Sequence, residues 1–456
     1  MAEVIHKLSS VFGISRKIPL TYQHRKYVDG KLKDNLYREK HIVIYGGSKQ
    51  GKTCLRKHSL KDEEYIVVQC SNATLISQIY SSVLKEAGAT IDISEKSTLK
   101  GEKKLKVEVK TGISIPFVSS TQAGGGYDHG SATENSSEKR HFEIDPSDPN
   151  DVIRVLDGID FKKFIVLEDF HYLSEEVQKQ VAMDLKAFHE KSSLSFIVVG
   201  VWLESNRLVM YNGDLAGRLI PIDADNWEAN DLEEIINSGE SLLNVTFSDE
   251  VKKAMLDAAQ GNVGILQEAS YRLCEDAGIL ETQSKFCQLN NPSAVNVIVS
   301  ELAREQAGRY QNFLTQFVEG IAKSDLEMYK WLMYIVIDSN AVELRAGLKA
   351  FEIFTRMQRV HPYRERLRYN NTLQALRNVG KLQHLKRVQP VILDFDSTEN
   401  VLRIVDSGFT LFLTAQDKQM LKDQIGLGVL PPRAPESEVS PAQLDFDSFG
   451  ENSNPG

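Results

Sequence analysis

The stretch His41 to Lys57, HIVIYGGSKQGKTCLRK, decides the fold of this chain. A short apolar run, Ile42 to Tyr45, leads into an octet that matches G-x-x-x-x-G-K-[ST] at every fixed position. In such a loop, glycines let successive backbone N–H groups surround phosphate oxygens at the positive end of the following helix. The stretch therefore predicts a phosphate-binding loop between a strand and a helix, against the alternative of an ordinary glycine turn.

Two side chains of the loop have predicted contacts with a nucleotide. Lys52 would reach the β- and γ-phosphates, and the hydroxyl of Thr53 would hold Mg²⁺. The expected cofactors are ATP and Mg²⁺. The predicted cofactor-binding residues are Gly46, Gly47, Ser48, Lys49, Gln50, Gly51, Lys52, Thr53 and Cys54.

Length and composition narrow the class of protein. A chain of 456 residues with 41% apolar content suggests two or three domains with real cores. A net charge of −9 argues against a generic polyanion binder, although local basic patches remain possible. The cysteines form no C-x-x-C pair, which argues against zinc sites and disulfide scaffolds. No apolar run is long enough for a membrane span, so we expect a cytoplasmic protein without membrane contact.

Further apolar runs continue the α/β pattern. The run YIVVQC (65–70) predicts a second strand, and residues 74–87 predict a helix. A third run, Phe164 to Leu167, ends in Glu168 and Asp169. Strands that alternate with helices imply a parallel sheet with right-handed crossovers. We assign Glu168, with Thr53, to the metal and Asp169 to the attacking water, both as catalytic residues; His171 is either a γ-phosphate contact or a surface histidine at the strand exit.

Residues 90–150 interrupt this pattern. The segment LKVEVKTGISIPFVSS (105–120) alternates like a pair of strands, and residues 121–140 are rich in glycine and serine. We interpret 90–150 as an insertion in the core. A pore loop, a hairpin that binds a protein partner, and a hairpin without a role all fit this segment.

The following elements resemble those of the AAA+ ATPases and their STAND-type relatives, closest to the replication-initiator and transposon-regulator branches. An apolar strand over 195–201 is followed by Glu204, Ser205 and Asn206, and then by DLAGRLI (214–220). The resemblance implies a γ-phosphate sensor among residues 204–206. It also implies an arginine that contacts nucleotide across a subunit interface; Arg218 is the first choice and Arg207 the second, with a structural salt bridge as the alternative for Arg218.

After Asn226 the sequence becomes helical. Helices are predicted over 229–238 and 248–260, and Gly261-Asn262-Val263-Gly264 opens a further helix to residue 277. By the resemblance, these helices form a lid over ATP, and the Gly-Asn-x-Gly opening is similar to the second-sensor helix. The arginine that many AAA+ enzymes place there is absent, which favours a slow switch over a fast motor. Gln267 is a further residue that would approach the phosphates.

The final third predicts a winged helix. Helices over 325–337, 343–359 and 369–379 precede two strands within 390–413, which flank a turn at 397–400. Residues 341–390 contain eleven Lys+Arg and three Asp+Glu, so their net charge is 11 − 3 = +8, as expected of a nucleic-acid contact. A winged helix that docks a protein is the alternative. The candidate DNA contacts are Arg364, Arg366, Arg368, Asn370, Asn371, Gln374, Arg377 and Lys381.

The predicted fold class is α/β: a P-loop NTPase parallel sheet, AAA+-like, with a helical lid and a C-terminal winged helix. The predicted parts are an N-terminal arm (1–40), the ATPase core (41–230) with its insertion (90–150), the lid (231–315), the winged helix (325–415) and a disordered acidic tail (426–456).

The function we favour is an ATP-binding switch that hydrolyses ATP slowly, forms homo-oligomers and binds DNA, as in replication initiation, mobile-element control or antiphage defence. The alternative is a STAND-like signalling scaffold, in which the nucleotide state gates a protein partner without DNA. A protein partner could bind the insertion or the acidic tail. We do not favour a processive motor, because no further helicase motifs are visible.

Overall fold

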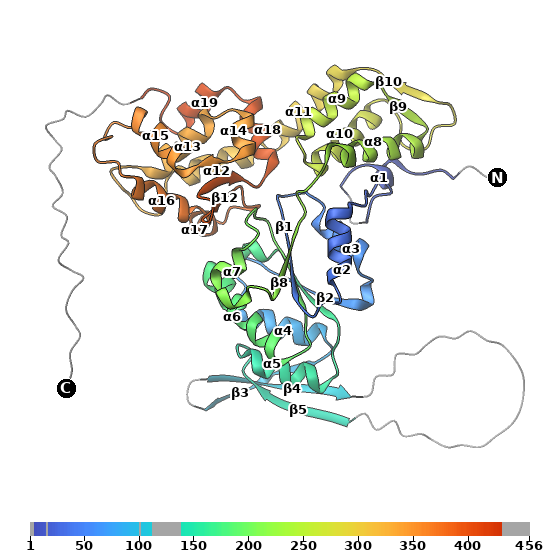
Figure 1. The fold of residues 1–456 in the computed structure, drawn as a ribbon, viewed down its shortest axis with the longest axis vertical. Helices are drawn as coiled ribbons and strands as arrows, with labels where there is room; N and C mark the ends of the chain where they lie inside the picture. The colour runs from blue at the N-terminus through green and yellow to red at the C-terminus, as the bar shows by residue number, and fades with distance from the viewer. Residues whose placement is uncertain (1–3, 15–16, 100–101, 112–137, 431–456) are drawn as a thin grey trace, which may run out of the picture.

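The computed structural model describes residues 4–14, 17–99, 102–111 and 138–430. Figure 1 shows three parts that meet at one junction: a core around a parallel sheet, a helical lid and a C-terminal domain. The core extends away from this junction, while the lid and the C-terminal domain lie on either side of it. The sheet strands point their carboxyl ends toward the junction, so the loops that follow them lie between all three parts.

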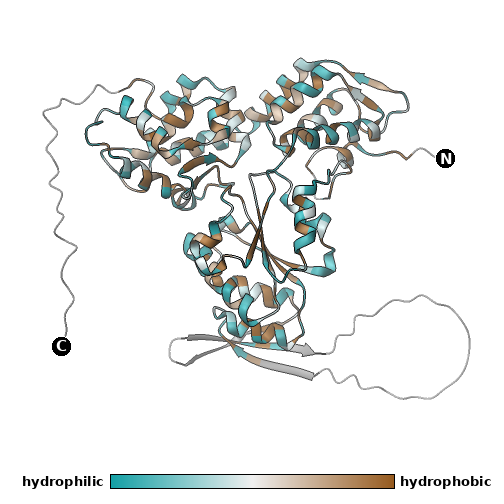
Figure 2. Ribbon diagram, viewed as in Figure 1, coloured by the Kyte–Doolittle hydropathy of each residue, from teal (hydrophilic) through white to brown (hydrophobic). Residues whose placement is uncertain are grey.

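The core sheet has five parallel strands in the order β2-β6-β7-β1-β8. Its strands are β1 (His41–Tyr45), β2 (Tyr65–Gln69), β6 (Phe164–Glu168), β7 (Phe196–Val199) and β8 (Leu219–Asp223). Alternate residues of β1 face opposite sides: Val43 belongs to one apolar cluster, and Ile42 and Ile44 belong to the other. Burial of both faces explains why these strands are continuously apolar and appear brown in Figure 2. The predicted α/β parallel sheet is confirmed.

Helices cover both faces of this sheet. Side chains of α2 and α3 pack on one face, and those of α4, α5 and α6 pack on the other. The core helices are α2 (Lys31–Asn35), α3 (Lys52–Ser59), α4 (Ile76–Glu86), α5 (Pro149–Gly158), α6 (Glu175–Lys191) and α7 (Arg207–Tyr211). Short helical turns are η1 (Lys26–Gly30), η2 (Asp62–Glu64), η3 (Phe170–Tyr172) and η4 (Gly213–Leu215).

The insertion forms a three-stranded antiparallel sheet in the order β3-β4-β5, at the end of the core away from the junction (Figure 1). Its strands are β3 (Thr90–Leu99), β4 (Glu102–Thr111) and β5 (Glu138–Ile144). Val107 and Ile144 join the core cluster on the α4 side of the main sheet. Of the strand pair predicted over 105–120, the structure describes only the part in β4, and most of the glycine-rich segment lies outside the described residues.

The lid is helical and includes the start of the chain. It consists of α1 (Leu8–Val11), α8 (Ala229–Leu243), β9 (Val245–Phe247), α9 (Asp249–Ala259), α10 (Val263–Asp276), β10 (Cys287–Leu289) and α11 (Pro292–Glu305). The Phe12 ring lies where a Cβ atom on Gly239 would approach it to 1.9 Å, so α8 needs glycine there. Val28 and Leu32 instead pack in the core. The N-terminal arm therefore crosses from the lid to the core.

The C-terminal domain has its own apolar cluster. It consists of α12 (Ala307–Val318), α13 (Met328–Asp338), α14 (Ala341–Ala346), β11 (Leu348–Lys349), α15 (Ala350–Val360), α16 (Tyr369–Arg377), α17 (Val379–Leu385), β12 (Leu393–Asp396), β13 (Val401–Ile404), α18 (Ser407–Ala415) and α19 (Lys418–Gln424). Three strands form an antiparallel sheet in the order β11-β13-β12. Helices followed by a β-hairpin fit the predicted winged-helix order.

Three boundaries in this region differ from the sequence predictions. The helix predicted over 343–359 is two helices, because Gly347 has a φ of 85° and the next two residues form β11 against β13. The second strand of the hairpin ends at Ile404, and α18 follows it because Asp406 caps that helix. α12 packs with the C-terminal cluster, so the lid ends at α11, before the predicted residue 315.

Within the described residues, no helix has the length and apolar character required to cross a membrane.

Candidate functional site

The phosphate loop joins β1 to α3, and its backbone needs glycine at two positions. Gly46 and Gly51 have φ angles of 144° and 79°, in the region that L side chains disfavour. A Cβ atom on Gly46 would also lie 2.6 Å from Oδ1 of Asp225. The N–H of Gly47 donates to the same oxygen at 2.7 Å, so Asp225 fixes the base of the loop. No sequence motif had singled out Asp225, because it becomes a neighbour of the loop only through the pairing of β8 with β1.

Lys52 is the first residue of α3 and folds back over the loop. Its Nζ donates to the carbonyl oxygens of Gly46 at 3.0 Å and Gly47 at 2.5 Å. Burial lowers the pKa of Lys52 to about 8, although the charge of Asp225 opposes this shift. A buried ammonium at a helix start, beside a glycine-rich loop, suits an anionic ligand.

Three other predicted binding residues of the loop, Lys49, Gln50 and Cys54, differ in backbone conformation, contacts and burial. Lys49 has a left-handed backbone with φ of 61°. Gln50 turns toward the lid, where its amide donates to the carbonyl of Gly261 at 3.4 Å. Cys54 is half-buried in α3, and burial raises its thiol pKa, so a role in binding would use its backbone N–H.

The acidic pair at the end of β6 lies beside the loop, as predicted. The Thr53 hydroxyl donates to Oε1 of Glu168 at 2.7 Å, and Nε of Arg56 lies 3.3 Å from Oε2. A hydroxyl and a carboxylate this close fit a shared Mg²⁺ site. Asp169 has a φ of 57° and accepts a hydrogen bond from the Gln69 amide. Burial, and then the charge of Glu168, raise the pKa of Asp169.

The lid contacts the phosphate loop through Asn262. Its Oδ1 accepts the N–H of Ile265 at 3.0 Å and so caps α10. Its Nδ2 donates to the carbonyl of Ser48 at 3.1 Å and to Oγ of Ser407 at 2.9 Å. One amide side chain therefore joins the lid, the phosphate loop and the C-terminal domain.

Two other residues of α10 bear on the sequence predictions: Gln267, which was expected to approach the phosphates, and Gly264, which lies where many AAA+ enzymes have an arginine. Gln267 does not face the phosphate loop; its amide donates to Thr21 at 2.9 Å and accepts the N–H of Gly13 at 3.1 Å, so it holds the N-terminal arm. Gly264 packs on the loop so closely that a Cβ atom would lie 2.7 Å from Cβ of Lys49. This packing leaves no room for a larger side chain at Gly264, the second residue of α10.

The C-terminal domain contacts the loop directly. The N–H of Ser48 donates to the carbonyl of Val405 at 2.7 Å. Because the carbonyl of Ser48 accepts from Asn262, both backbone polar groups of this loop residue are bound by other parts of the chain. No local pattern predicts this contact, which joins residues more than three hundred positions apart.

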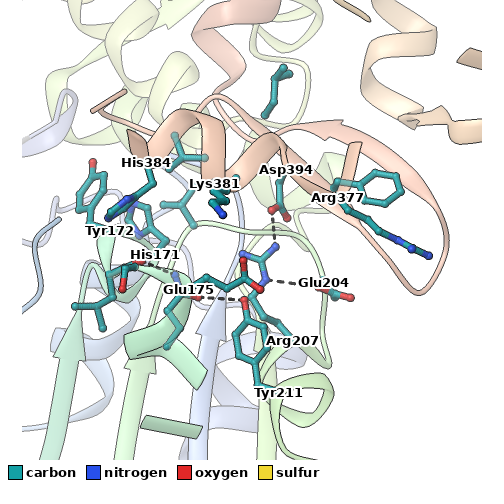
Figure 3. Close-up of a pocket in the computed structure, with 18 of the residues that line it drawn as sticks. His171, Tyr172, Glu175, Glu204, Arg207, Tyr211, Arg377, Lys381, His384 and Asp394 are labelled. Carbon is teal, nitrogen blue, oxygen red and sulfur yellow. Dashed lines mark hydrogen bonds and ion pairs between the residues drawn. The ribbon is translucent and has the colours of Figure 1, made fainter. Parts of the chain in front are cut away.

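The predicted sensor residues lie against the β12–β13 hairpin, which is the predicted wing. The Thr398 hydroxyl at its turn donates to Glu204 at 3.2 Å and accepts from the Asn206 amide at 3.4 Å. Arg207 forms ion pairs with Asp394 of β12 and, at 3.5 Å, with Glu204 (Figure 3). Burial by itself lowers the pKa of Arg207, but the Asp394 carboxylate, Tyr211 and Glu204 together outweigh it and raise the arginine pKa. Arg207 is therefore bound within its own chain, and its second-choice role toward a neighbouring subunit stays a prediction.

His171 is buried, and the prediction of a surface histidine is wrong. Its side chain follows β6 and is only 9% exposed. Neither ring nitrogen has a hydrogen-bond partner among the described residues. Burial, and then the charges of Lys52 and Arg207, lower its pKa to about 3. A neutral imidazole therefore lies between the phosphate loop and the predicted wing.

A cavity of about 350 Å³ separates the core from the C-terminal domain. Its core wall includes Glu175 and Glu176 of α6, and its opposite wall includes Arg377, Lys381 and His384 (Figure 3). The pKa of Glu176 is lowered mainly by its own backbone and Ser174, with smaller contributions from Lys381 and His384. Part of the basic surface of the C-terminal domain thus faces acidic groups of the core.

The candidate DNA contacts fall into two groups. Arg364 and Arg366 pair with Glu365 at 3.1 Å and Asp325 at 3.2 Å; Arg368 donates to the Glu365 carbonyl at 2.8 Å, and Asn371 caps α16. The second group is exposed without an ion pair among the described residues. It consists of Asn370, Gln374 and Arg377 of α16 and Lys381 of α17.

Arg218 lies at the amino end of β8, at the opposite end of the sheet from the phosphate loop. It forms an ion pair with Glu190 at 2.8 Å and donates to the carbonyl of Asp214. The side chain therefore makes the structural salt bridge that was the alternative to the interface role, and it is too remote to serve the loop of its own chain.

Comparisons with known proteins address the fold. No protein-family model matches the chain, and no curated protein matches it in sequence. Among solved structures, the Walker-type ATPase paby2304 of Pyrococcus abyssi matches at 13% identity and a TM-score of 0.51, over 89% of this chain and 99% of that chain. The Aeropyrum pernix Orc1 protein in complex with DNA matches at 11% identity and a TM-score of 0.44, over 93% and 98% of the chains. Cdc6p from Pyrobaculum aerophilum matches at 12% identity and a TM-score of 0.37, over 91% and 98%.

Proposed function

The chain has the fold of the AAA+ P-loop ATPases, and we propose that it is an ATP-dependent switch that binds DNA. ATP binds at the loop from Gly46 to Thr53, is hydrolysed slowly, and changes the contact between the core and the C-terminal domain. The protein acts in the cytoplasm as a homo-oligomer, in replication initiation, mobile-element control or antiphage defence.

Nucleotide binding is supported by the geometry of the loop. Lys52 supplies a buried positive charge, and the backbone amides from Lys49 to Cys54 supply hydrogen-bond donors. Thr53 and Glu168 would hold Mg²⁺, which would neutralise phosphate charge in the reaction. Asp169, whose carboxylate lies next to this pair, would orient the attacking water. The close packing of Gly264 on Lys49 leaves no place for an arginine at position 264, which supports slow turnover.

One observation carries the switch proposal: the N–H of Ser48 is bound by Val405 of the C-terminal domain. A nucleotide that enters the loop brings several negative charges to within contact distance of this carbonyl. Carbonyl oxygens and phosphate oxygens compete for the same donors, so nucleotide binding and the docked position of the C-terminal domain are coupled.

DNA binding is supported by the exposed surface of α16 and α17. Asn370, Gln374 and Arg377 lie on one face of α16, and amide and guanidinium groups suit the edges of bases. The predicted wing, however, is docked on the core through Thr398 and Asp394. Its use on DNA therefore requires that the C-terminal domain leave the core, which is the step we assign to ATP.

Oligomerisation would place Arg218 beside the nucleotide of a neighbouring chain. A guanidinium there would stabilise charge on the transferred phosphoryl group. The proposal requires that the ion pair with Glu190 break when the oligomer forms.

The docked wing also favours a second candidate function, the STAND-like scaffold. In that case the nucleotide releases the C-terminal domain toward a protein partner, and DNA plays no part. The insertion at the far end of the core would offer a separate surface for such a partner.

The deciding experiment measures affinity for a labelled duplex with ATP, with ADP and without nucleotide, at two salt concentrations. Wild type is compared with Lys52→Ala. Tighter binding with ATP that Lys52→Ala abolishes, and that weakens steeply with salt, supports the DNA switch. Binding to no duplex under any condition would overturn it in favour of the scaffold.

A further inference from the structure

Arg309 stands out among the cations of the C-terminal domain. It lies in the first turn of α12, close to the segment that touches the phosphate loop. Its Nη2 donates to Oδ2 of Asp406 at 2.6 Å and to Oε1 of Gln306 at 2.9 Å. Its Nε is buried and has no hydrogen-bond partner among the described residues. One face of the guanidinium lies 4.4 Å from the centre of the Tyr310 ring.

Asp406 connects this arginine to the phosphate loop. It is the residue between Val405, whose carbonyl accepts the N–H of Ser48, and Ser407, whose hydroxyl accepts from Asn262. Asp406 and Gln306 also line a cavity of about 40 Å³ together with Ser48 and Lys49. The two side chains that hold Arg309 therefore share a cavity with the phosphate loop itself.

Tyr172 relates the pair of Arg309 and Asp406 to the acids that follow β6. Tyr172 lies three residues after Asp169, in η3. Burial and then the charge of Asp169 raise its pKa, while Arg309 lowers it and Asp406 raises it. Arg309 and Asp406 thus lie within electrostatic range of Tyr172, three residues after the second predicted catalytic acid.

Three other arginines near the loop, and Lys52 of the loop itself, are already bound. Arg56 pairs with Glu168, Arg207 pairs with Asp394, and Arg25 donates to the carbonyls of Ala224 and Asn226. Lys52 is held by two loop carbonyls but keeps one N–H, since an ammonium has three donors. A γ-phosphate carries more charge than this single donor can satisfy. Arg309 belongs to the C-terminal domain, and its carboxylate partner, Asp406, can be replaced by a phosphate of the same sign.

We propose that Arg309 is a nucleotide-binding residue supplied by the C-terminal domain, and that Asp406 occupies it in the place of the γ-phosphate. When ATP binds, the guanidinium exchanges the Asp406 carboxylate for phosphate oxygens. Asp406 is then left facing like charge, which weakens the adjacent contact between Val405 and Ser48. ADP, which lacks the γ-phosphate, leaves the pair of Arg309 and Asp406 in place. This inference rests on the proposed nucleotide binding and names the residue that distinguishes ATP from ADP.

The test measures the affinity of the full chain for ADP and for the β,γ-imido analogue of ATP by calorimetry with Mg²⁺. The variants are Arg309→Gln and Asp406→Asn, and asparagine keeps the cap of α18. The matched control is Arg356→Gln, an arginine of the same domain whose carboxylate partners are Asp338, Glu343 and Glu352.

Arg309→Gln is expected to weaken binding of the ATP analogue about tenfold or more, since a hydrogen bond to a charged group is lost, and to leave ADP affinity unchanged. Asp406→Asn is expected to tighten binding of the analogue several-fold, and Arg356→Gln to change neither affinity. Unchanged ADP affinity also shows that Arg309→Gln remains folded.

Two results would overturn the inference while nucleotide binding stands: equal loss of both affinities in Arg309→Gln, or weaker binding of the analogue in Asp406→Asn. If wild type binds neither nucleotide, the proposed function itself fails.

Discussion

The N–H of Ser48 and the carbonyl of Val405 lie 2.7 Å apart, so the phosphate loop and the C-terminal domain share a hydrogen bond. This bond stands beside a second link, in which Asn262 of the lid donates to both Ser48 and Ser407. Three parts of the chain are thus joined at the residue that would lie beside a nucleotide. Substitutions of the residues that make these hydrogen bonds should therefore alter the arrangement of the three parts as well as the affinity for nucleotide.

Asn262→Asp tests the second link. Aspartate keeps an acceptor for the N–H of Ile265 and so retains the cap of α10, but it loses the donor to Ser48 and Ser407. We expect faster backbone hydrogen exchange in residues 405–408 without loss of overall stability. Asn291→Asp is the matched control, because Asn291 caps α11 by accepting the N–H of Ser293, away from the loop. Equal exchange in wild type and Asn262→Asp would contradict the link.

The ion pair between Arg207 and Asp394 should stabilise the docked wing. The two side chains are 14% and 10% exposed, and loss of one partner leaves the other charge buried. Arg207→Met is expected to reduce the free energy of unfolding by about 3 kcal/mol in urea titrations. Lys162→Met, which breaks an exposed pair with Asp160, should cost less than about 1 kcal/mol. Similar losses in both variants would show that the wing contact contributes little.

The two acids after β6 should have separable roles in hydrolysis. Glu168→Gln removes the charge next to Thr53, so we expect the Mg²⁺ concentration for half-maximal turnover to rise at least several-fold. Asp169→Asn should lower kcat by about 10²-fold or more while nucleotide affinity stays unchanged. Steady-state assays over a Mg²⁺ series distinguish the two, and the reverse pattern would exchange the assignments.

His41 predicts a stability change in mild acid. It is buried at the start of β1, where Nε2 lies 2.8 Å from the Leu185 carbonyl and Nδ1 accepts the N–H of Phe196 at 3.1 Å. Burial lowers its pKa to about 4 from an ordinary value of 6.5. The unfolded chain therefore takes up a proton near pH 6.5 that the folded chain refuses until about pH 4. Stability from this group is complete above pH 6.5 and is lost as the pH falls through this range.

The measurement is urea unfolding of wild type and His41→Gln between pH 7 and pH 4. The wild-type slope should exceed that of the variant by up to one proton, or about 1.4 kcal/mol per pH unit. An NMR signal of this ring that titrates near pH 6.5 in the folded protein would rule out the interpretation.

Arg377 should contribute charge to a DNA contact. It is exposed on α16, in the wall of the cavity that faces the core, and has no ion pair among the described residues. If it meets a phosphate, Arg377→Gln should reduce the slope of log affinity against log salt by about 0.9. Arg356→Gln, whose guanidinium is paired within the domain, should leave the slope unchanged. No difference between the variants would place Arg377 outside the interface.

Local sequence patterns predicted the core correctly. Features that depend on contacts between distant residues were not predicted. The loop, Glu168 and the helix predicted over 74–87 follow from patterns within a few residues, so the sequence located them well. The helix predicted over 343–359 is interrupted at Gly347, because the pairing of β11 with β13 stabilises an interruption that no local pattern predicts. His171 and Arg207 have polar side chains that suggest a surface, yet the docked C-terminal domain buries them. Asp225 and Arg309 had no motif, because their partners come from distant parts of the chain.

The crossing of the N-terminal arm sets how each part can rotate. Phe12 is fixed in the lid and Val28 in the core, and a second crossing joins β8 to α8. Because the lid is attached to the core at these two points, we expect it to rotate about the axis that joins them. The C-terminal domain is joined to the rest by the single connection between α11 and α12, so once its noncovalent contacts break it can swivel about all axes. We therefore expect the lid to open and close about this axis, and the released C-terminal domain to reorient toward a partner.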